Sequence, residues 1–195
     1  KASELAYFLG NAEPTIVICD SDSIPTMESV LPEKGVKALL TLDIDGGGTL
    51  MALAAGANTE IAVAQCKGTD MAALLYSSGT TGQPKGIMLS HDNLRKNAET
   101  LVEVWGFSAS DRLLHMLPIY HVHGLFIGVG CVLLSGASMV WHRGFNDEAA
   151  IAALPDCTTM MGVPTFYTRL LANPHFGRHC CANMRLFISG SAPLL

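Results

Sequence analysis

A glycine-rich run bearing four hydroxyl groups and one lysine is the part of this sequence best suited to chemistry. Residues 77–86 read Ser-Ser-Gly-Thr-Thr-Gly-Gln-Pro-Lys-Gly. Glycine lets backbone N–H groups approach a phosphate chain closely, hydroxyls add hydrogen bonds, and a lysine offsets negative charge. The residues predicted to bind the phosphates of a nucleotide are Ser77, Ser78, Gly79, Thr80, Thr81, Gly82 and Lys85.

The spacing within this loop excludes the commonest phosphate loop. In a Walker A pattern the fifth residue after the first glycine is the glycine of a Gly-Lys pair. Here the fifth residue after Gly79 is Pro84, and the fifth after Gly82 is Ile87. A plain Ser/Gly-rich surface turn is the other interpretation. It is disfavoured because the loop directly follows an apolar, strand-like segment at 71–76 and ends in Pro-Lys-Gly.

The elements that must position this loop alternate along the chain. Apolar, β-rich segments predict strands at 15–19, 38–42, 71–76, 112–116, 138–141, 158–161 and 185–189. Helical patterns cover 2–9, 26–33, 50–55, 122–134, 146–154 and 164–172, and another helix, capped by Ser90 or Asp92, ends near 105. Alternation of this kind predicts an α/β fold, in which helices cover a mainly parallel sheet.

Composition narrows the class of function. The 195 residues are 49% hydrophobic and 15% charged, which is typical of a compact globular chain forming one domain or part of one. A net charge of −5 gives no support for a nucleic-acid partner. The six cysteines contain no CxxC pair, which disfavours a disulfide framework and indicates a reducing compartment. The apolar stretch 124–140 is too interrupted by glycine and serine to span a membrane.

Several strings together resemble one family. The string at 76–86 resembles the signature loop of the adenylate-forming superfamily, which includes acyl-CoA synthetases, luciferases and the adenylation domains of peptide synthetases. Residues 117–125, Leu-Pro-Ile-Tyr-His-Val-His-Gly-Leu, and 188–194, Ile-Ser-Gly-Ser-Ala-Pro-Leu, are similar to its later segments and follow in the family's order. Segments 4–9 and 161–171 are similar as well. The resemblance implies that residues 1–195 are an internal fragment of the family's large AMP-binding domain, truncated at both ends and without the small C-terminal domain.

The resemblance also assigns roles to residues. It implies that Lys85 and His121 are catalytic, with His121 beside the carboxylate of the acyl substrate, and that the hydroxyls of Thr80 and Thr81 lie near a Mg²⁺ ion. Gly162 and Val163 fall in the segment similar to the acyl pocket. The turn expected to receive the adenine of ATP consists of Gly190, Ser191, Ala192 and Pro193.

Two alternatives concern the histidines. Taken alone, His121 is better explained as a core histidine, and only the surrounding string favours the site. His123 has no assigned role. A zinc site that combines it with His175, His179 and Cys180 or Cys181 matches no recognised ligand spacing, and zinc is disfavoured.

The segments 117–126, 161–171 and 184–195 are most similar to the malonyl-CoA synthetase branch of the family. A second substrate carboxylate would suit a bidentate arginine. Arg185 is a candidate, although a strand-end surface residue is its simpler interpretation, and the resemblance places the diacid-binding arginine after Leu195.

The activity implied by the resemblance is ATP-dependent activation of a carboxylate to an acyl-adenylate, followed by thioester formation with coenzyme A. Malonate or methylmalonate is the expected acid, and ATP, Mg²⁺ and coenzyme A are the expected cofactors and co-substrates. The fragment alone is expected to be inactive. We expect a cytoplasmic or mitochondrial-matrix enzyme with small-molecule partners. The alternatives are a ligase for another fatty or aryl acid and a non-catalytic nucleotide-binding module.

Overall fold

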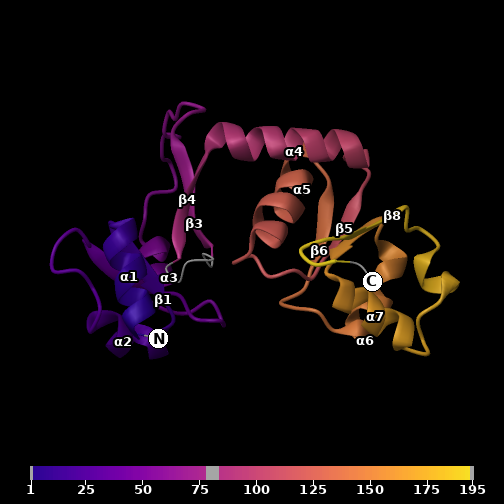
Figure 1. Cartoon of the computed structure of the whole chain (residues 1–195), viewed down its shortest axis with the longest axis horizontal. Helices are drawn as coiled ribbons and strands as arrows, with labels where there is room; N and C mark the ends of the chain where they lie inside the picture. Colours follow the sequence, from indigo (N-terminus) through magenta and orange to yellow (C-terminus); the bar gives the residue numbers. More distant parts are fainter. Residues whose placement is uncertain (1, 78–83, 194–195) are drawn as a thin grey trace. The chain divides into compact units, whose positions relative to one another are not determined.

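The computed structural model describes residues 2–77 and 84–193, and it divides the chain into two compact units (Figure 1). The first unit is Lys1–Leu89 and the second is Ser90–Leu195. Each unit has its own parallel strands, which confirms the predicted α/β class. In the described part of the chain, no helix has the length and apolarity that crossing a bilayer requires.

The first unit contains two small sheets. Strands β1 and β2 are parallel, with Ile16 opposite Ala38, and β3 pairs with β4 in a second sheet. The elements are α1 (Ala2–Ala12), β1 (Ile16–Cys19), η1 (Ser21–Ser23), α2 (Ile24–Glu28), β2 (Ala38–Thr41), α3 (Thr49–Ala55), β3 (Met71–Ser77) and β4 (Lys85–Ser90).

Strand β4 is the element of this unit that the sequence did not predict. Its side chains give no clear alternation of buried and exposed positions, and Met88 is 73% exposed. Pairing with β3 is what makes it a strand. Gly86 allows this approach, because a Cβ there would lie 3.2 Å from a methyl carbon of Leu74 and 3.4 Å from the ring of Tyr76.

The second unit has one four-stranded parallel sheet in the order β6-β5-β7-β8. Its elements are α4 (His91–Trp105), β5 (Arg112–His115), η2 (His123–Val129), α5 (Gly130–Ser135), β6 (Ser138–Trp141), α6 (Asp147–Ala153), η3 (Leu154–Asp156), β7 (Thr159–Gly162), α7 (Pro164–Ala172), η4 (Arg178–Cys181) and β8 (Leu186–Ser189).

Both faces of this sheet are covered. Because successive strand side chains point to opposite faces, Leu113 and Leu114 of β5 enter different clusters. Leu114 packs with residues of α6, α7 and η4, and Leu113 packs with residues of α4 and α5. Such burial on both faces is typical of parallel sheets.

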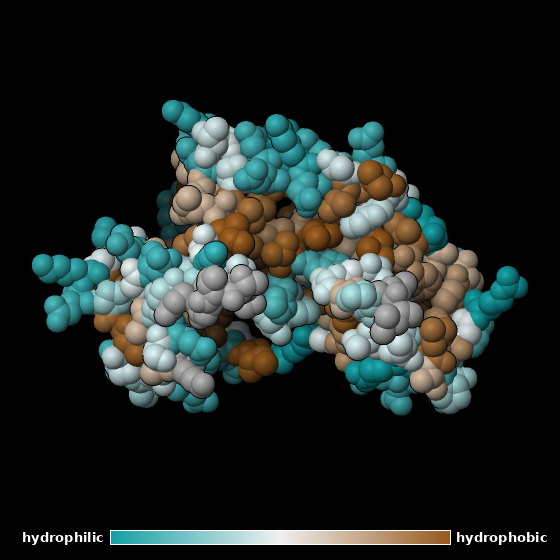
Figure 2. Space-filling view, viewed as in Figure 1, coloured by the Kyte–Doolittle hydropathy of each residue, from teal (hydrophilic) through white to brown (hydrophobic). Residues whose placement is uncertain are grey.

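Helix α4 is amphipathic and well capped. The Ser90 hydroxyl accepts a hydrogen bond from the Asn93 N–H at 3.1 Å, and the Asn93 side chain accepts one from the Ser90 N–H at 3.0 Å. Of the two predicted caps, Ser90 is therefore the one observed. Figure 2 shows the hydrophilic outer side of α4 above hydrophobic residues. Trp105 of α4 packs against the core cluster that contains Leu113.

The predicted helix 122–134 is instead a π-helix, η2, followed by the short helix α5. Two glycines of η2 lie against the end of β5 and the residues that follow it. A Cβ on Gly124 would clash with the carbonyl of Pro118, and a Cβ on Gly128 would lie 3.0 Å from the ring of His115. Single π turns often occur at functional sites.

Candidate functional site

A pocket of about 410 Å³ opens beside the carboxyl ends of the strands of the second unit. We call it the strand-end pocket. Its walls come from residues 117–118 and 121–124, which follow β5, from Val163, which follows β7, and from Ser191, which follows β8. Parallel α/β sheets bind ligands at this edge. A mainly apolar wall with a few polar groups is the usual composition of a small-molecule site.

His121 is the exposed imidazole of the pocket. It follows Tyr120, whose ring centroid lies 4.8 Å from its own, and its N–H donates to the Pro118 carbonyl at 3.3 Å. This short turn places the histidine between β5 and η2, where it lines the pocket. An imidazole N–H at such a point can donate a hydrogen bond to a carboxylate.

His123 is the second imidazole of the pocket, and it is only 8% exposed. Its Nδ1 lies 3.0 Å from the Ser191 hydroxyl oxygen. Burial lowers the pKa of His123, so the ring is neutral near pH 7. Sequence reasoning gave His123 no role, because its partner is 68 residues away. The only available signal was its place in the 117–125 string.

The turn after β8 is held by its neighbours. The Gly190 N–H donates to the Gly162 carbonyl at 3.1 Å, and Ser191 has a left-handed φ of +67°. A Cβ on Gly190 would lie 3.2 Å from Cε1 of His123. Gly190 and Ser191 thus lie against the buried histidine, Gly162 holds Gly190, and Val163 lines the same pocket. Ala192 and Pro193 continue the turn.

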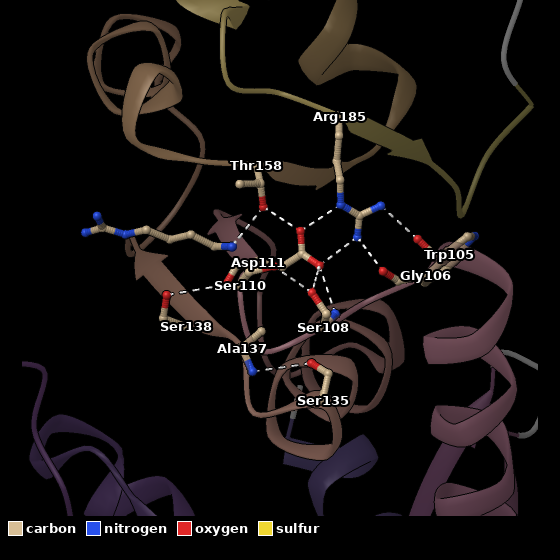
Figure 3. A network of polar contacts seen from close by, with 11 residues as sticks. Trp105, Gly106, Ser108, Ser110, Asp111, Ser135, Ala137, Ser138, Thr158 and Arg185 are labelled. Carbon is tan, nitrogen blue, oxygen red and sulfur yellow. Dashed lines mark hydrogen bonds and ion pairs between the residues drawn. The ribbon is translucent and has the colours of Figure 1, made fainter.

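Arg185 lies at the opposite edge of the sheet. It precedes β8, and its ion-pair partner Asp111 precedes β5. The guanidinium Nε and Nη2 donate to the two carboxylate oxygens of Asp111, both at 2.7 Å, and the carbonyls of Trp105 and Gly106 accept further bonds (Figure 3). The structure thus engages this predicted substrate-binding side chain at the amino ends of the strands and does not bring it together with His121.

Asp111 is the centre of this network. Its side chain is 3% exposed and also accepts from the Thr158 hydroxyl at 2.8 Å and the Ser108 N–H at 2.9 Å. The hydrogen bonds from Arg185 first, and then those from Thr158 and Ser108, hold the pKa of Asp111 far below its usual value against the opposing effect of burial. The network ties the starts of β5, β7 and β8 together.

Comparison with known families gives the family of this chain. The whole chain, residues 1–195, matches the AMP-binding enzyme family. The chain belongs to that family. This family assignment confirms the resemblance expected from the loop, from the 117–125 string and from the turn after β8.

Related proteins are ligases of the same family. The chain is 33% identical over 214 residues to the mitochondrial malonate–CoA ligase of Bos taurus, covering 98% of this chain and 35% of that protein. It is 27% identical over 216 residues to the malonate–CoA ligase of Arabidopsis thaliana, covering 98% of this chain and 35% of that protein. The chain therefore spans about one third of the length of these relatives.

Among solved structures, ATP-bound MatB from Rhodopseudomonas palustris is similar over 100% of this chain and 39% of its own, with 46% identity and a TM-score of 0.95. This similarity supports the arrangement of helices and strands described above. The structure of a malonyl-CoA ligase with methylmalonyl-CoA and AMP bound covers 98% of this chain and 39% of its own, with 30% identity and a TM-score of 0.76.

The glycine-rich loop, which is predicted to bind phosphate, is described only at its two ends. Ser77 ends β3 and Lys85, which is exposed, begins β4. Ser78, Gly79, Thr80, Thr81 and Gly82 lie outside the described residues, and their predicted contacts stay predictions. The exit of the loop is fixed by the Tyr7 hydroxyl, which donates to the Pro84 carbonyl at 2.7 Å.

Mg²⁺ was predicted near Thr80 and Thr81, outside the described residues. Within the described ranges 2–77 and 84–193, His, Cys, Asp and Glu side chains form no group of three or more that could hold a metal ion.

Proposed function

We propose that the protein containing this chain is an AMP-forming acyl-CoA ligase whose acid substrate is malonate or methylmalonate. The observation that carries the proposal is the strand-end pocket, in which His121, His123 and Ser191 meet beside the small-residue turn after β8. The malonate–CoA ligases among the relatives support the choice of acid. The chain contributes part of the large domain of such an enzyme.

The acid would enter the strand-end pocket. Carboxylate oxygens accept hydrogen bonds, and the exposed His121 ring can donate one from the pocket wall. The Ser191 hydroxyl can donate another when Nδ1 of His123 carries the proton and donates to it. Leu117 and Val163 supply apolar wall for the methylene of malonate or the methyl group of methylmalonate. His121 would orient the reacting carboxylate, which is the role that the resemblance implies for it.

The turn after β8 would receive the adenine of ATP, and the glycine-rich loop would bind phosphates. The turn is narrow and free of large side chains at Gly190, which suits a flat adenine ring. Lys85 would offset the charge of the β- and γ-phosphates. The MatB structure with ATP bound supports this assignment. Mg²⁺, when bound near the hydroxyls of Thr80 and Thr81, would neutralise phosphate oxygens.

The reaction has two displacement steps. An oxygen of the carboxylate attacks the α-phosphorus of ATP and pyrophosphate leaves, giving an acyl-adenylate. The sulfur of coenzyme A, as a thiolate, then attacks the acyl carbon and AMP leaves with the bonding electrons. The chain's own residues bind, orient and balance charge in the first step. The related complex with methylmalonyl-CoA and AMP supports the second.

Two compartments are proposed for this enzyme. The Bos taurus relative is described as mitochondrial, which supports the mitochondrial matrix as one location of this enzyme. A reducing compartment fits the free thiols of all six cysteines, and the cytoplasm is the other location that we propose.

Exchange of labelled pyrophosphate into ATP tests the proposal. The purified full-length protein is assayed with malonate, methylmalonate, acetate and octanoate in turn. We expect exchange with the two diacids to exceed exchange with the monoacids by about tenfold or more. Faster exchange with acetate or octanoate rejects the choice of acid, and absence of exchange with every carboxylate supports a non-catalytic nucleotide-binding module.

A further inference from the structure

His115 is a buried histidine to which the proposed reaction gives no role. It ends β5, two residues before the pocket wall begins at Leu117, and its side chain is 0% exposed. Neither ring nitrogen has a hydrogen-bond partner within residues 2–77 and 84–193. Burial first, and His123 second, lower the pKa of His115, so the ring is neutral near pH 7.

The ring of His115 fits closely between two neighbours. The Trp141 ring, at the matching position of β6, has its centroid 4.6 Å away at an angle of 56°. On the side of η2, a Cβ on Gly128 would lie 3.0 Å from both Cε1 and Nδ1 of His115. The backbone of η2 therefore rests directly on the edge of the imidazole.

This arrangement is not explained by stability alone. A buried polar ring without partners lowers stability, and an apolar side chain of the same shape would avoid that loss. Phenylalanine has a larger, six-membered ring and leucine is branched, so neither matches a flat five-membered ring in this gap. Residues that break a local rule of stability are often found at functional sites.

The short helix η2 connects His115 to the wall of the strand-end pocket. η2 begins at His123, and its Gly128 lies against the ring of His115. The position of η2 on His115 therefore determines the position of the His123 ring. His123 in turn makes the 3.0 Å contact with Ser191. These contacts connect the end of β5 to the turn after β8.

We propose that His115 is a positioning residue of the strand-end pocket. Its ring seats η2 through Gly128 and so fixes His123 against Ser191, at the place where the acid substrate binds. This role rests on the proposed function, since the effect on substrate is an effect on the acid of that reaction. His115 itself does not line the pocket.

The test uses a size-compensating pair in the full-length protein. His115→Ala removes the ring on which η2 packs, and the methyl group added by Gly128→Ala displaces the His115 ring. Each is expected to raise the KM for malonate about tenfold, with kcat and the KM for ATP changed by no more than about twofold. In the double variant the added methyl group at 128 partly fills the space left at 115, so its KM for malonate is expected to lie closer to wild type than that of His115→Ala.

Met160→Ala is the matched control. Met160 is also 0% exposed but lies in the cluster on the other face of the sheet. It is expected to lower the melting temperature without changing the KM for malonate. If His115→Ala changes this KM no more than Met160→Ala does, or if the double variant shows no recovery, His115 is a core residue and the proposal fails. If His115→Ala does not fold, Gly128→Ala against Met160→Ala decides in the same way.

A second readout does not depend on activity. In protein labelled with ¹⁵N at histidine, the ring nitrogens of His123 report its hydrogen bond to Ser191 without substrate. His115→Ala is expected to shift these resonances, and unchanged resonances overturn the proposal. If the wild-type protein shows no carboxylate-dependent exchange, the proposed function has failed, and the His123 resonances alone decide whether His115 positions that ring.

Discussion

At the scale of residues, the strand-end pocket depends on close contacts that only small side chains permit. Gly190 lies against the ring of His123, and the hydroxyl of Ser191 meets the Nδ1 of the same ring. The small-residue turn after β8 is therefore shaped by a side chain from η2. This contact gives a physical reason for glycine and serine at these two positions.

Gly190→Ala tests that reason. Its Cβ would lie 3.2 Å from Cε1 of His123, and the ring would have to shift to make room. We expect the KM for malonate to rise about fivefold, measured as pyrophosphate exchange by the full-length protein. Gly144→Ala is the control, since nothing lies within 4 Å of a Cβ there. An unchanged KM in Gly190→Ala would show that the contact does not shape the site.

Lys85→Met tests the loop at its described end. The change keeps an unbranched side chain, shorter by one atom, and removes its charge, which we propose offsets the charge of the phosphates. The first step, measured as malonate-dependent pyrophosphate exchange, is expected to slow about 100-fold, while circular dichroism stays unchanged because Lys85 is exposed. Exchange within twofold of wild type would remove Lys85 from the proposed site.

At the scale of elements, the Asp111–Arg185 network joins the amino ends of three strands (Figure 3). Asp111→Asn removes the charge that Arg185 faces. Fully buried pairs lose about 3–5 kcal/mol when one partner is removed, but the Arg185 side chain is 39% exposed and solvent screens part of the effect. We expect a loss of about 2 kcal/mol in the free energy of unfolding by urea.

The same network makes stability depend on pH. The folded pKa of Asp111 lies below its unfolded value, so its contribution to stability is present above about pH 4 and is lost as pH falls toward the folded pKa. Urea unfolding of the wild type between pH 6 and pH 3 is expected to show the onset of this loss below about pH 4, and Asp111→Asn is expected to show a flatter profile. Parallel profiles would exclude Asp111 as the titrating group.

Arg185→Met separates the two roles considered for this arginine. The network predicts a lower free energy of unfolding and an unchanged ratio of kcat/KM for malonate to kcat/KM for acetate. A substrate-binding arginine predicts the opposite, because losing a bidentate carboxylate partner would reduce the malonate preference by about tenfold or more. The ratio is measured in the full-length protein at a temperature where the variant is folded.

At the scale of the whole molecule, the sequence was informative where local patterns decide the structure. The alternation of strands and helices predicted the parallel sheet of the second unit. Ser90, which caps α4, was one of the two caps predicted for that helix. The π-helix was not predictable, because it depends on how Gly128 meets a ring of β5. The contact of His123 with Ser191 spans 68 residues and leaves no periodic trace in the sequence.

The central claim is tested most directly by the products of the complete reaction. The purified full-length protein is incubated with malonate, ATP, Mg²⁺ and coenzyme A, and thioester and nucleotide are quantified by mass spectrometry and chromatography. We predict malonyl-CoA and AMP in equal amounts, with neither formed when malonate is omitted. Formation of ADP in place of AMP, or no malonyl-CoA in the presence of all four components, would contradict the account.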